Sequence, residues 1–228
     1  MQIPRFSDHD CYENLIEGIN LIAYFMFSSV QIFFFLTMLA TGSAFSKMRD
    51  ICFYTWDKGM DMAGRKRVIM DREGKHPYLV RYYLLFCDRS EYTKFNIFIH
   101  QILKSDEDDM HDHPWGYFTC ILSGGYWETV GKVECDDEDN KIKSYTRTRF
   151  WRNPWFMQRV KDTHIHRLEL KKDEYIDREI PCWTLFIPFI RTRNWGFYVR
   201  DKDSEDCLVW EDSEEYIKKK LEGSKKED

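Results

Sequence analysis

The sequence has no C-x-x-C pair, and its seven cysteines are scattered and odd in number. This distribution argues against a zinc ribbon or a disulfide scaffold and suits a reducing compartment. The chain also lacks a surplus of basic residues, with 34 Lys and Arg against 39 Asp and Glu and a formal net charge of −5. A general nucleic-acid binder needs a positive field to displace counterions from phosphate. Nucleic acid is therefore not expected as a partner.

Long-range disorder is excluded as well, because hydrophobic residues make up 43% of the chain and aromatic residues 17%. The 228 residues correspond to about one and a half typical domains. The sequence contains no internal repeat and no low-complexity block. One globular domain with an additional segment is therefore expected.

The additional segment lies near the N-terminus, where no charged residue occurs between Glu17 and Lys47. As a helix, residues 21–40 would span about 30 Å, the thickness of bilayer hydrocarbon. We predict a tail over residues 1–17 and a hydrophobic helix over residues 18–46, with membrane association through residues 19–41. Acidic residues precede this segment and basic residues follow it, so the remaining chain is expected to face the cytosol.

Three alternatives stay open for this segment. A cleaved signal peptide would need a basic start and a shorter apolar region. A buried core helix seldom runs this long without a polar face. Alternatively, translation begins at Met48, and the protein is then cytoplasmic.

Short runs rich in Tyr, Phe, Ile, Val and Thr follow from about Arg65, separated by turn signals. With no long amphipathic helices between them, they predict a mainly β fold: a single small antiparallel β-barrel over residues 65–210. A C-terminal helix and tail are expected over residues 211–228, and a solvated hairpin loop over residues 134–140. The expected strands are Leu79–Phe86, Phe95–Leu103, Trp115–Leu122, Tyr126–Val130, Lys143–Phe150, His166–Leu170, Cys182–Pro188 and Trp195–Val199.

Four of the seven histidines form two H-x-H pairs, His111-Asp112-His113 and His164-Ile165-His166. On a strand, residues i and i+2 project to the same face, so each pair would aim both rings at one point. If both strands belong to one small barrel, the pairs can converge inside it. Neutral imidazoles are common ligands of iron, zinc, copper and nickel. The alternative is that these are surface or core histidines with ordinary hydrogen bonds.

The run HDHPWGYFTCILSGGYWE, which begins at His111, resembles the first motif of the cupin superfamily, in which two histidines open a strand and a glycine turn closes it. The run His166-Arg167-Leu168-Glu169 resembles the second motif. The resemblance covers about Arg65 to Trp210 and implies a cupin, or jelly-roll, barrel. Locally it is similar to thiol dioxygenases of the cysteine dioxygenase type and to an uncharacterised group of bacterial and viral cupins. Cupin sheets often pair, which implies a homodimer.

The sequence departs from cupins with four metal ligands, which usually carry a glutamate five residues after the second histidine. Here that position is Phe118. The resemblance therefore implies a three-histidine site made of His111, His113 and His166, with Fe(II) favoured and Zn, Ni or Mn left open. Without an anionic protein ligand the metal keeps its +2 charge, which favours a small anionic substrate.

The resulting hypothesis is a non-haem Fe(II) dioxygenase acting on a small molecule. A cupin sugar or sugar-nucleotide isomerase or epimerase is the first alternative. It carries less weight because many such enzymes work without metal and pair a catalytic His with a Tyr. A non-catalytic module that binds a metal or ligand is the second alternative.

Further side chains are candidates for the pocket. His164 is expected to support the ligands, to face the substrate or to lie outside the barrel mouth. His100 belongs either to the core or to the pocket. Arg81 and Tyr83 share a strand face and either clamp a carboxylate or phosphate or form an edge-strand ion pair. Glu128 is either an acid/base near the metal or part of a cross-strand ion pair.

Overall fold

The computed structural model describes residues 46–87, 94–107, 109–135, 142–200 and 208–224. It divides into two compact units, Met1–Met60 and Asp61–Asp228. The hydrophobic helix expected at residues 18–46 lies almost wholly outside the described residues, and so does most of the loop expected at 134–140. Of the first unit the structure describes most of one further helix that the sequence did not predict, α2 (Ser46–Met62).

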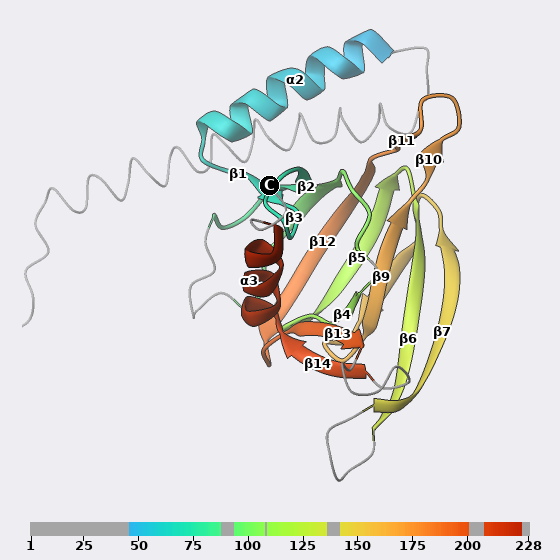
Figure 1. Ribbon diagram of the computed structural model, residues 1–228. Coiled ribbons are helices and arrows are strands. Elements are labelled where there is room, and N and C mark those ends of the chain that lie inside the picture. Colours follow the sequence, from blue (N-terminus) through green and yellow to red (C-terminus); the bar gives the residue numbers. More distant parts are fainter. Residues whose placement is uncertain (1–45, 88–93, 108, 136–141, 201–207, 225–228) are drawn as a thin grey trace, which may run out of the picture. The chain divides into compact units, whose positions relative to one another are not determined.

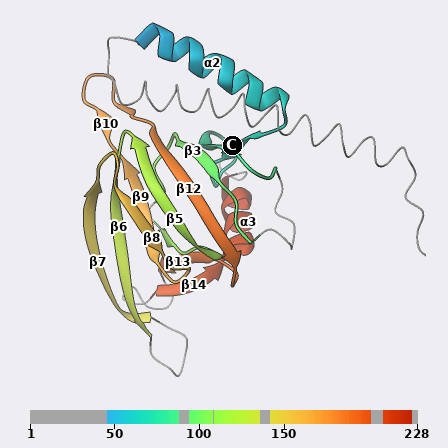
Figure 2. The ribbon, with the colours of Figure 1, turned by 180° about the vertical axis from the view of Figure 1, so that it is seen from behind.

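The second unit is mainly β, and its strand pairs are antiparallel, which confirms the predicted class. One sheet has the order β1-β2-β3-β12-β5-β8. Figure 1 and the reverse view in Figure 2 show β12 and β5 side by side near the middle of this sheet. Its strands are β1 (Lys66–Met70), β2 (Pro77–Tyr83), β3 (Phe98–Ile102), β5 (Trp115–Ser123), β8 (Met157–Val160) and β12 (Cys182–Arg191).

The second group of strands pairs in the order β13-β14-β7-β6-β9-β4, and β4 pairs with β13 in turn, so the pairing returns to its start. The β6–β7 hairpin is its longest pairing, whereas β4–β9 and β14–β7 are each joined by one residue pair. Its strands are β4 (Met110–His111), β6 (Tyr126–Cys135), β7 (Ile142–Arg152), β9 (Ile165–Leu170), β13 (Gly196–Arg200) and β14 (Leu208–Asp212).

The chain passes from the first sheet to the second group through a two-residue glycine turn between β5 and β6. Gly125 has φ +141°, and a Cβ there would lie 2.7 Å from the carbonyl oxygen of Arg152. A side chain at this position would be strained by both the backbone conformation and the contact. Glycine is therefore needed where the two strand groups join.

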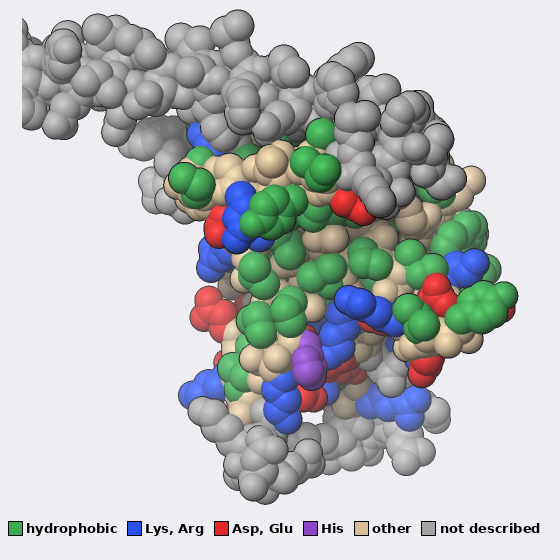
Figure 3. Space-filling view, turned by 90° about the horizontal axis from the view of Figure 1, so that it is seen from above, with side chains coloured by type: hydrophobic (Ala, Val, Ile, Leu, Met, Phe, Trp, Pro, Cys, Tyr) green, Lys and Arg blue, Asp and Glu red, His purple; other side chains and the backbone are tan. Residues whose placement is uncertain are grey.

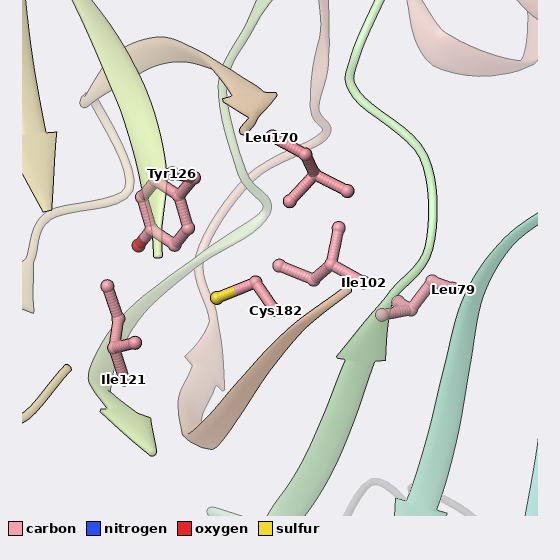
Figure 4. Packing of buried hydrophobic residues seen from close by; sticks show 6 residues of the cluster. All are labelled: Leu79, Ile102, Ile121, Tyr126, Leu170 and Cys182. Atoms are coloured by element: carbon pink, nitrogen blue, oxygen red, sulfur yellow. The ribbon is translucent and has the colours of Figure 1, made fainter. Parts of the chain in front are cut away.

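Hydrophobic side chains from both strand groups form a common core, shown in Figure 4. The six residues of this cluster are Leu79, Ile102, Ile121 and Cys182 from the first sheet and Tyr126 and Leu170 from the second group. Ile121 and Cys182 are fully buried. Because both groups contribute, burial of these side chains holds the two groups together.

Two smaller elements complete the described part of this unit. Strands β10 (Lys172–Asp173) and β11 (Arg178–Glu179) form a short hairpin in which Tyr175 is 96% exposed. Figure 3 shows that hydrophobic side chains on one face of the molecule lie beside Lys and Arg side chains. Helix α3 (Ser213–Ser224) is capped by Asp212, whose Oδ1 accepts a hydrogen bond from the Glu214 amide at 2.9 Å.

The predicted strands and the C-terminal helix are present, with boundaries that differ by a few residues. The sequence did not indicate the shortest strands, such as β4 and β10, because two residues are too few to show an alternating pattern. Neither of the helices that the structure describes, α2 and α3, is long and apolar enough to span a bilayer.

Candidate metal centre

Three histidines meet at one point of the second unit. His111 ends β4 and is the cross-strand partner of His166 on β9, while His113 lies in the segment between β4 and β5. The ring centroids are 5.1 Å apart for His111 and His113, 5.0 Å for His111 and His166, and 5.1 Å for His113 and His166. One ring nitrogen from each lies within 4.8 Å of the other two. The structure thus brings together the three residues expected to be metal ligands.

The route to this cluster differs from the expected one. Both members of each H-x-H pair were expected on one strand, but only His111 and His166 lie on strands. β4 ends at His111, and Pro114, which has no backbone N–H to donate to a ladder, follows shortly after. His113 reaches the cluster through a turn that must be held in place by other contacts.

Asp112 supplies those contacts. Its fully buried carboxylate accepts hydrogen bonds from the Gly196 amide at 2.8 Å, Arg193 Nη2 at 2.8 Å, Trp210 Nε1 at 3.1 Å and the Tyr198 hydroxyl at 3.2 Å. Burial raises the pKa of Asp112, although these donors and the Arg193 charge oppose that shift. The residue between the two histidines thus fastens them to β13 and β14.

The donor atoms fit a divalent transition metal. Nε2 of His113 lies 2.9 Å from Nε2 of His166. Nδ1 of His111 is buried without a hydrogen-bond partner among the described residues and lies 3.9 Å from Oδ2 of Asp106. Burial, together with the charge that neighbouring histidines would carry, lowers the pKa of His111 and of His113 well below the usual value. Both rings are therefore neutral at physiological pH, which is the form that binds a metal.

Glu128 lies on β6, the strand that pairs with β9. Its fully buried carboxylate accepts hydrogen bonds from His166 Nδ1 at 2.8 Å, His164 Nε2 at 3.1 Å and Arg152 Nε at 2.7 Å. Burial alone would raise the pKa of Glu128, but the hydrogen bonds from His164 and His166 and the bond from Arg152 together hold it well below its usual range. The carboxylate is therefore ionised, and the expected cross-strand ion pair is present, with Arg152.

The three histidines open into a cavity of about 480 Å³ between the two strand groups. This volume falls within the range of small-molecule sites. Each of four strands of the first sheet lines the cavity with at least one pair of residues at positions i and i+2, as expected for one face of a strand. These residues are Leu79 and Arg81, His100 and Ile102, Tyr117 and Thr119, and Thr184 and Phe186.

Arg81 lies in this cavity without an anionic partner. No carboxylate of the described residues lies within ion-pair distance of its guanidinium, which donates from Nε to His100 Nε2 at 3.0 Å and lies over the Phe98 ring at 4.8 Å. β2 lies between β1 and β3, so Arg81 is not on an edge strand, and the ion pair considered from the sequence is not found among the described residues. Tyr83 packs against Phe98 at 5.1 Å instead of lining the cavity.

His100 and His164, which are not part of the three-histidine cluster, take different positions. Burial, followed by the charges of Arg81 and His113, lowers the pKa of His100 well below its usual value. Neutral His100 thus accepts from Arg81 and lines the cavity. His164 is half-buried, does not line the cavity and bonds to Glu128. It therefore contacts the same carboxylate as His166 and lies outside the cavity wall.

Two phenols in the cavity were not proposed as site residues. Tyr117 has its ring centroid 5.0 Å from that of His113, and Tyr126 precedes Glu128 on the same face of β6. Neither phenol has a hydrogen-bond partner among the described residues, and burial raises the pKa of both well above the usual value. Both are therefore available as donors. The alternation of β5, which puts Tyr117 on the same strand face as Thr119, is the sequence signal that could have identified it.

Comparisons with known proteins find matches among solved structures. No family model and no curated protein matches the chain. Among solved structures it is similar to hydroxypropylphosphonic acid epoxidase from S. wedmorenis, with 11% identity and a TM-score of 0.36 over 54% of this chain and 55% of that one. It is also similar to a structure of Fe(II)-HppE with the alternative substrate (S)-1-HPP, with 12% identity and a TM-score of 0.38 over 54% and 56% of the two chains.

A cupin-2 domain from Rhodospirillum rubrum is similar as well, with 11% identity and a TM-score of 0.38 over 60% of this chain and 77% of that one. The chain spans a little over half the length of the HppE structures that it matches.

Proposed function

We propose that this protein is a metal-dependent dioxygenase that uses non-haem Fe(II) and acts on a small anionic substrate. One observation carries the proposal: three clustered imidazoles open into a cavity whose wall includes Arg81, a cation with no carboxylate partner among the described residues. The three imidazoles carry no negative charge, so a bound divalent metal would keep its positive charge and, like Arg81, would attract an anion.

The residues would divide the work as follows. His111, His113 and His166 would hold the metal, which when bound supplies a +2 charge and redox chemistry with dioxygen that no side chain provides. Arg81 would bind the anionic group of the substrate, fixed in direction by its hydrogen bond to His100. Tyr117 and Tyr126 would donate hydrogen bonds to polar groups of the substrate.

A combined metal and oxygen experiment tests the proposal. Protein purified without an affinity tag is analysed for metal, loaded with Fe(II) without air, and then screened for oxygen uptake with matched pairs of thiols that carry or lack a carboxylate. We expect bound iron and oxygen uptake with the carboxylate-bearing members. Absence of iron binding, or iron binding without oxygen uptake on any substrate in a broader screen of thiols and sugars, would contradict it.

The isomerase or epimerase alternative has one observation in its favour. The rings of His113 and Tyr117 lie side by side in the cavity, and the Tyr117 phenol keeps its proton and can donate a hydrogen bond. Binding of a nucleotide-sugar by the metal-free protein, unchanged in the His111→Ala variant, would favour this function over the dioxygenase.

A further inference from the structure

The carboxylate of Glu128 lies beside His166 and is not part of the cavity wall. It is fully buried and does not line the cavity, so it has no direct access to a substrate. Its contact with His166 is made through Nδ1, at 2.8 Å, whereas Nε2 of the same ring lies 2.9 Å from His113. The two nitrogens of one ring thus face two different groups.

We propose that Glu128 is a positioning residue of the three-histidine centre, which fixes His166 so that the lone pair of its Nε2 faces His111 and His113. This inference rests on the proposed metal centre. A carboxylate that only accepts hydrogen bonds requires the proton of a neutral imidazole to be on the nitrogen that it contacts. With the proton of His166 on Nδ1, Nε2 is left free to bind a metal.

The other contacts of Glu128 keep the carboxylate in place. Arg152 donates from Nε to Oε2 at 2.7 Å, and its guanidinium lies over the Phe150 and Phe156 rings at 4.8 and 4.4 Å. His164 donates to Oε1 at 3.1 Å, the same oxygen that accepts from His166. Each carboxylate oxygen therefore has at least one donor, so rotation of the group would break several bonds at once.

The backbone adds rigidity to this arrangement. In the pairing of β6 with β9, Glu128 lies opposite Leu168, and Val130 lies opposite His166. Both residues that form the contact are thus held by one continuous ladder. His111 joins it as the partner of His166 on β4. The carboxylate and two of the three ligands are fixed on adjacent strands.

Glu128, His164 and His166 also lie close enough to one another to hold a second metal ion. Arg152 argues against this use, because its permanently charged guanidinium is in contact with the same carboxylate and would repel a second cation. One metal per chain is therefore expected.

The first test uses the wild-type protein without metal. Long-range ¹H–¹⁵N spectra of protein labelled in histidine, recorded at pH 8, report which nitrogen of each ring carries the proton. We expect His166 to be protonated at Nδ1. Protonation at Nε2 would overturn the proposal, and this result does not depend on whether the protein binds metal.

The second test compares Glu128→Gln with Glu169→Gln by titration with Co(II), followed by absorption in the visible range. Glu169 is a matched control because it is on β9 and pairs with Arg149 and Arg167 on the protein surface, where its side chain is 40% exposed. We expect Glu128→Gln to bind Co(II) about 10- to 100-fold more weakly, with an altered spectrum. Glu169→Gln should bind as the wild type does.

The outcomes separate the two proposals. Unchanged affinity and spectrum in Glu128→Gln would overturn the positioning role and leave the metal centre intact. Equal Co(II) binding by the wild type and His113→Ala would overturn the metal centre and, with it, the positioning role. Two Co(II) ions per wild-type chain, one of them lost in Glu128→Gln, would assign Glu128 to a second metal site instead. If Glu128→Gln does not fold, the ¹H–¹⁵N spectra of the wild type still test the positioning role, because they show which nitrogen of His166 carries the proton.

Discussion

His111 and His166 are cross-strand partners on β4 and β9, with ring centroids 5.0 Å apart. Their backbones are joined by a ladder, so the distance between the rings is set by strand pairing and not by flexible side chains. His113, the third histidine of the cluster, lies in a turn next to Asp112. Hydrogen bonds to the Asp112 carboxylate hold this turn against β13 and β14. The centre is thus preorganised by main-chain hydrogen bonds and two buried carboxylates, Asp112 and Glu128.

Loss of one ligand should abolish metal binding. We expect His113→Ala to reduce the metal content from stoichiometric to background, because two imidazoles without a third hold a divalent ion weakly. Elemental analysis of protein purified without an affinity tag measures this content. His76→Ala, which alters an exposed histidine, should keep the wild-type content. An unchanged content in His113→Ala would disprove the assignment.

Arg81 should determine anion binding. A ligand at ten times its dissociation constant stabilises the folded state by about 1.4 kcal/mol. We expect the melting temperature of the metal-free wild type to rise more in sodium sulfate than in sodium chloride of equal ionic strength, and Arg81→Met to lose most of that difference. Arg159→Met alters an exposed arginine on β8 and should respond as the wild type does. Equal responses of all three proteins would show that the cavity has no anion site at Arg81.

His100 should make the stability of the metal-free protein depend on pH. Its pKa in the folded protein is well below 6.5, whereas the unfolded chain takes up a proton near that value. Below about pH 6.5 the unfolded state therefore binds more protons than the folded state. The free energy of unfolding then decreases as the pH is lowered, by up to about 1.4 kcal/mol per pH unit for this group. Above that pH the contribution is fully present.

His100→Gln keeps an acceptor for Arg81 but does not titrate. We therefore expect urea unfolding between pH 7 and pH 5 to show a weaker pH dependence in this variant than in the wild type. His76→Gln, an exposed position, should keep the wild-type slope. If His100→Gln keeps it too, His100 takes up its proton equally in both states.

Asp112 should contribute to stability as well as to the geometry of the site. Asp112→Ala would leave the Gly196 amide and Trp210 Nε1 without their acceptor, and we expect a loss of about 2–4 kcal/mol in the free energy of unfolding. Denaturant unfolding measures this loss. Asp162→Ala removes a carboxylate with an exposed bond to Thr192 and should cost less than about 1 kcal/mol. Similar losses in both variants would show that the buried hydrogen bonds of Asp112 do not stabilise the fold more than an exposed one does.

Much of the fold could be predicted from local pattern. Alternating runs such as those of β5 and β12 depend only on which side chains face the core, and this period is visible in the sequence. The two-residue strand β4 is different. It exists because His111 pairs with both His166 and Phe197, and no local pattern shows such partners.

The sequence by itself determined the β class, the two histidine pairs and the lack of a carboxylate at Phe118, because composition and spacing are properties of the chain. Only the tertiary structure decided that His164 bonds to Glu128 and lies outside the cavity wall, and that Arg81 lies in the cavity without an anionic partner among the described residues. The physical reason is strand register. Which residues face each other across a sheet depends on how strands distant in the sequence align, and a shift of one residue would turn each of these side chains to the opposite face.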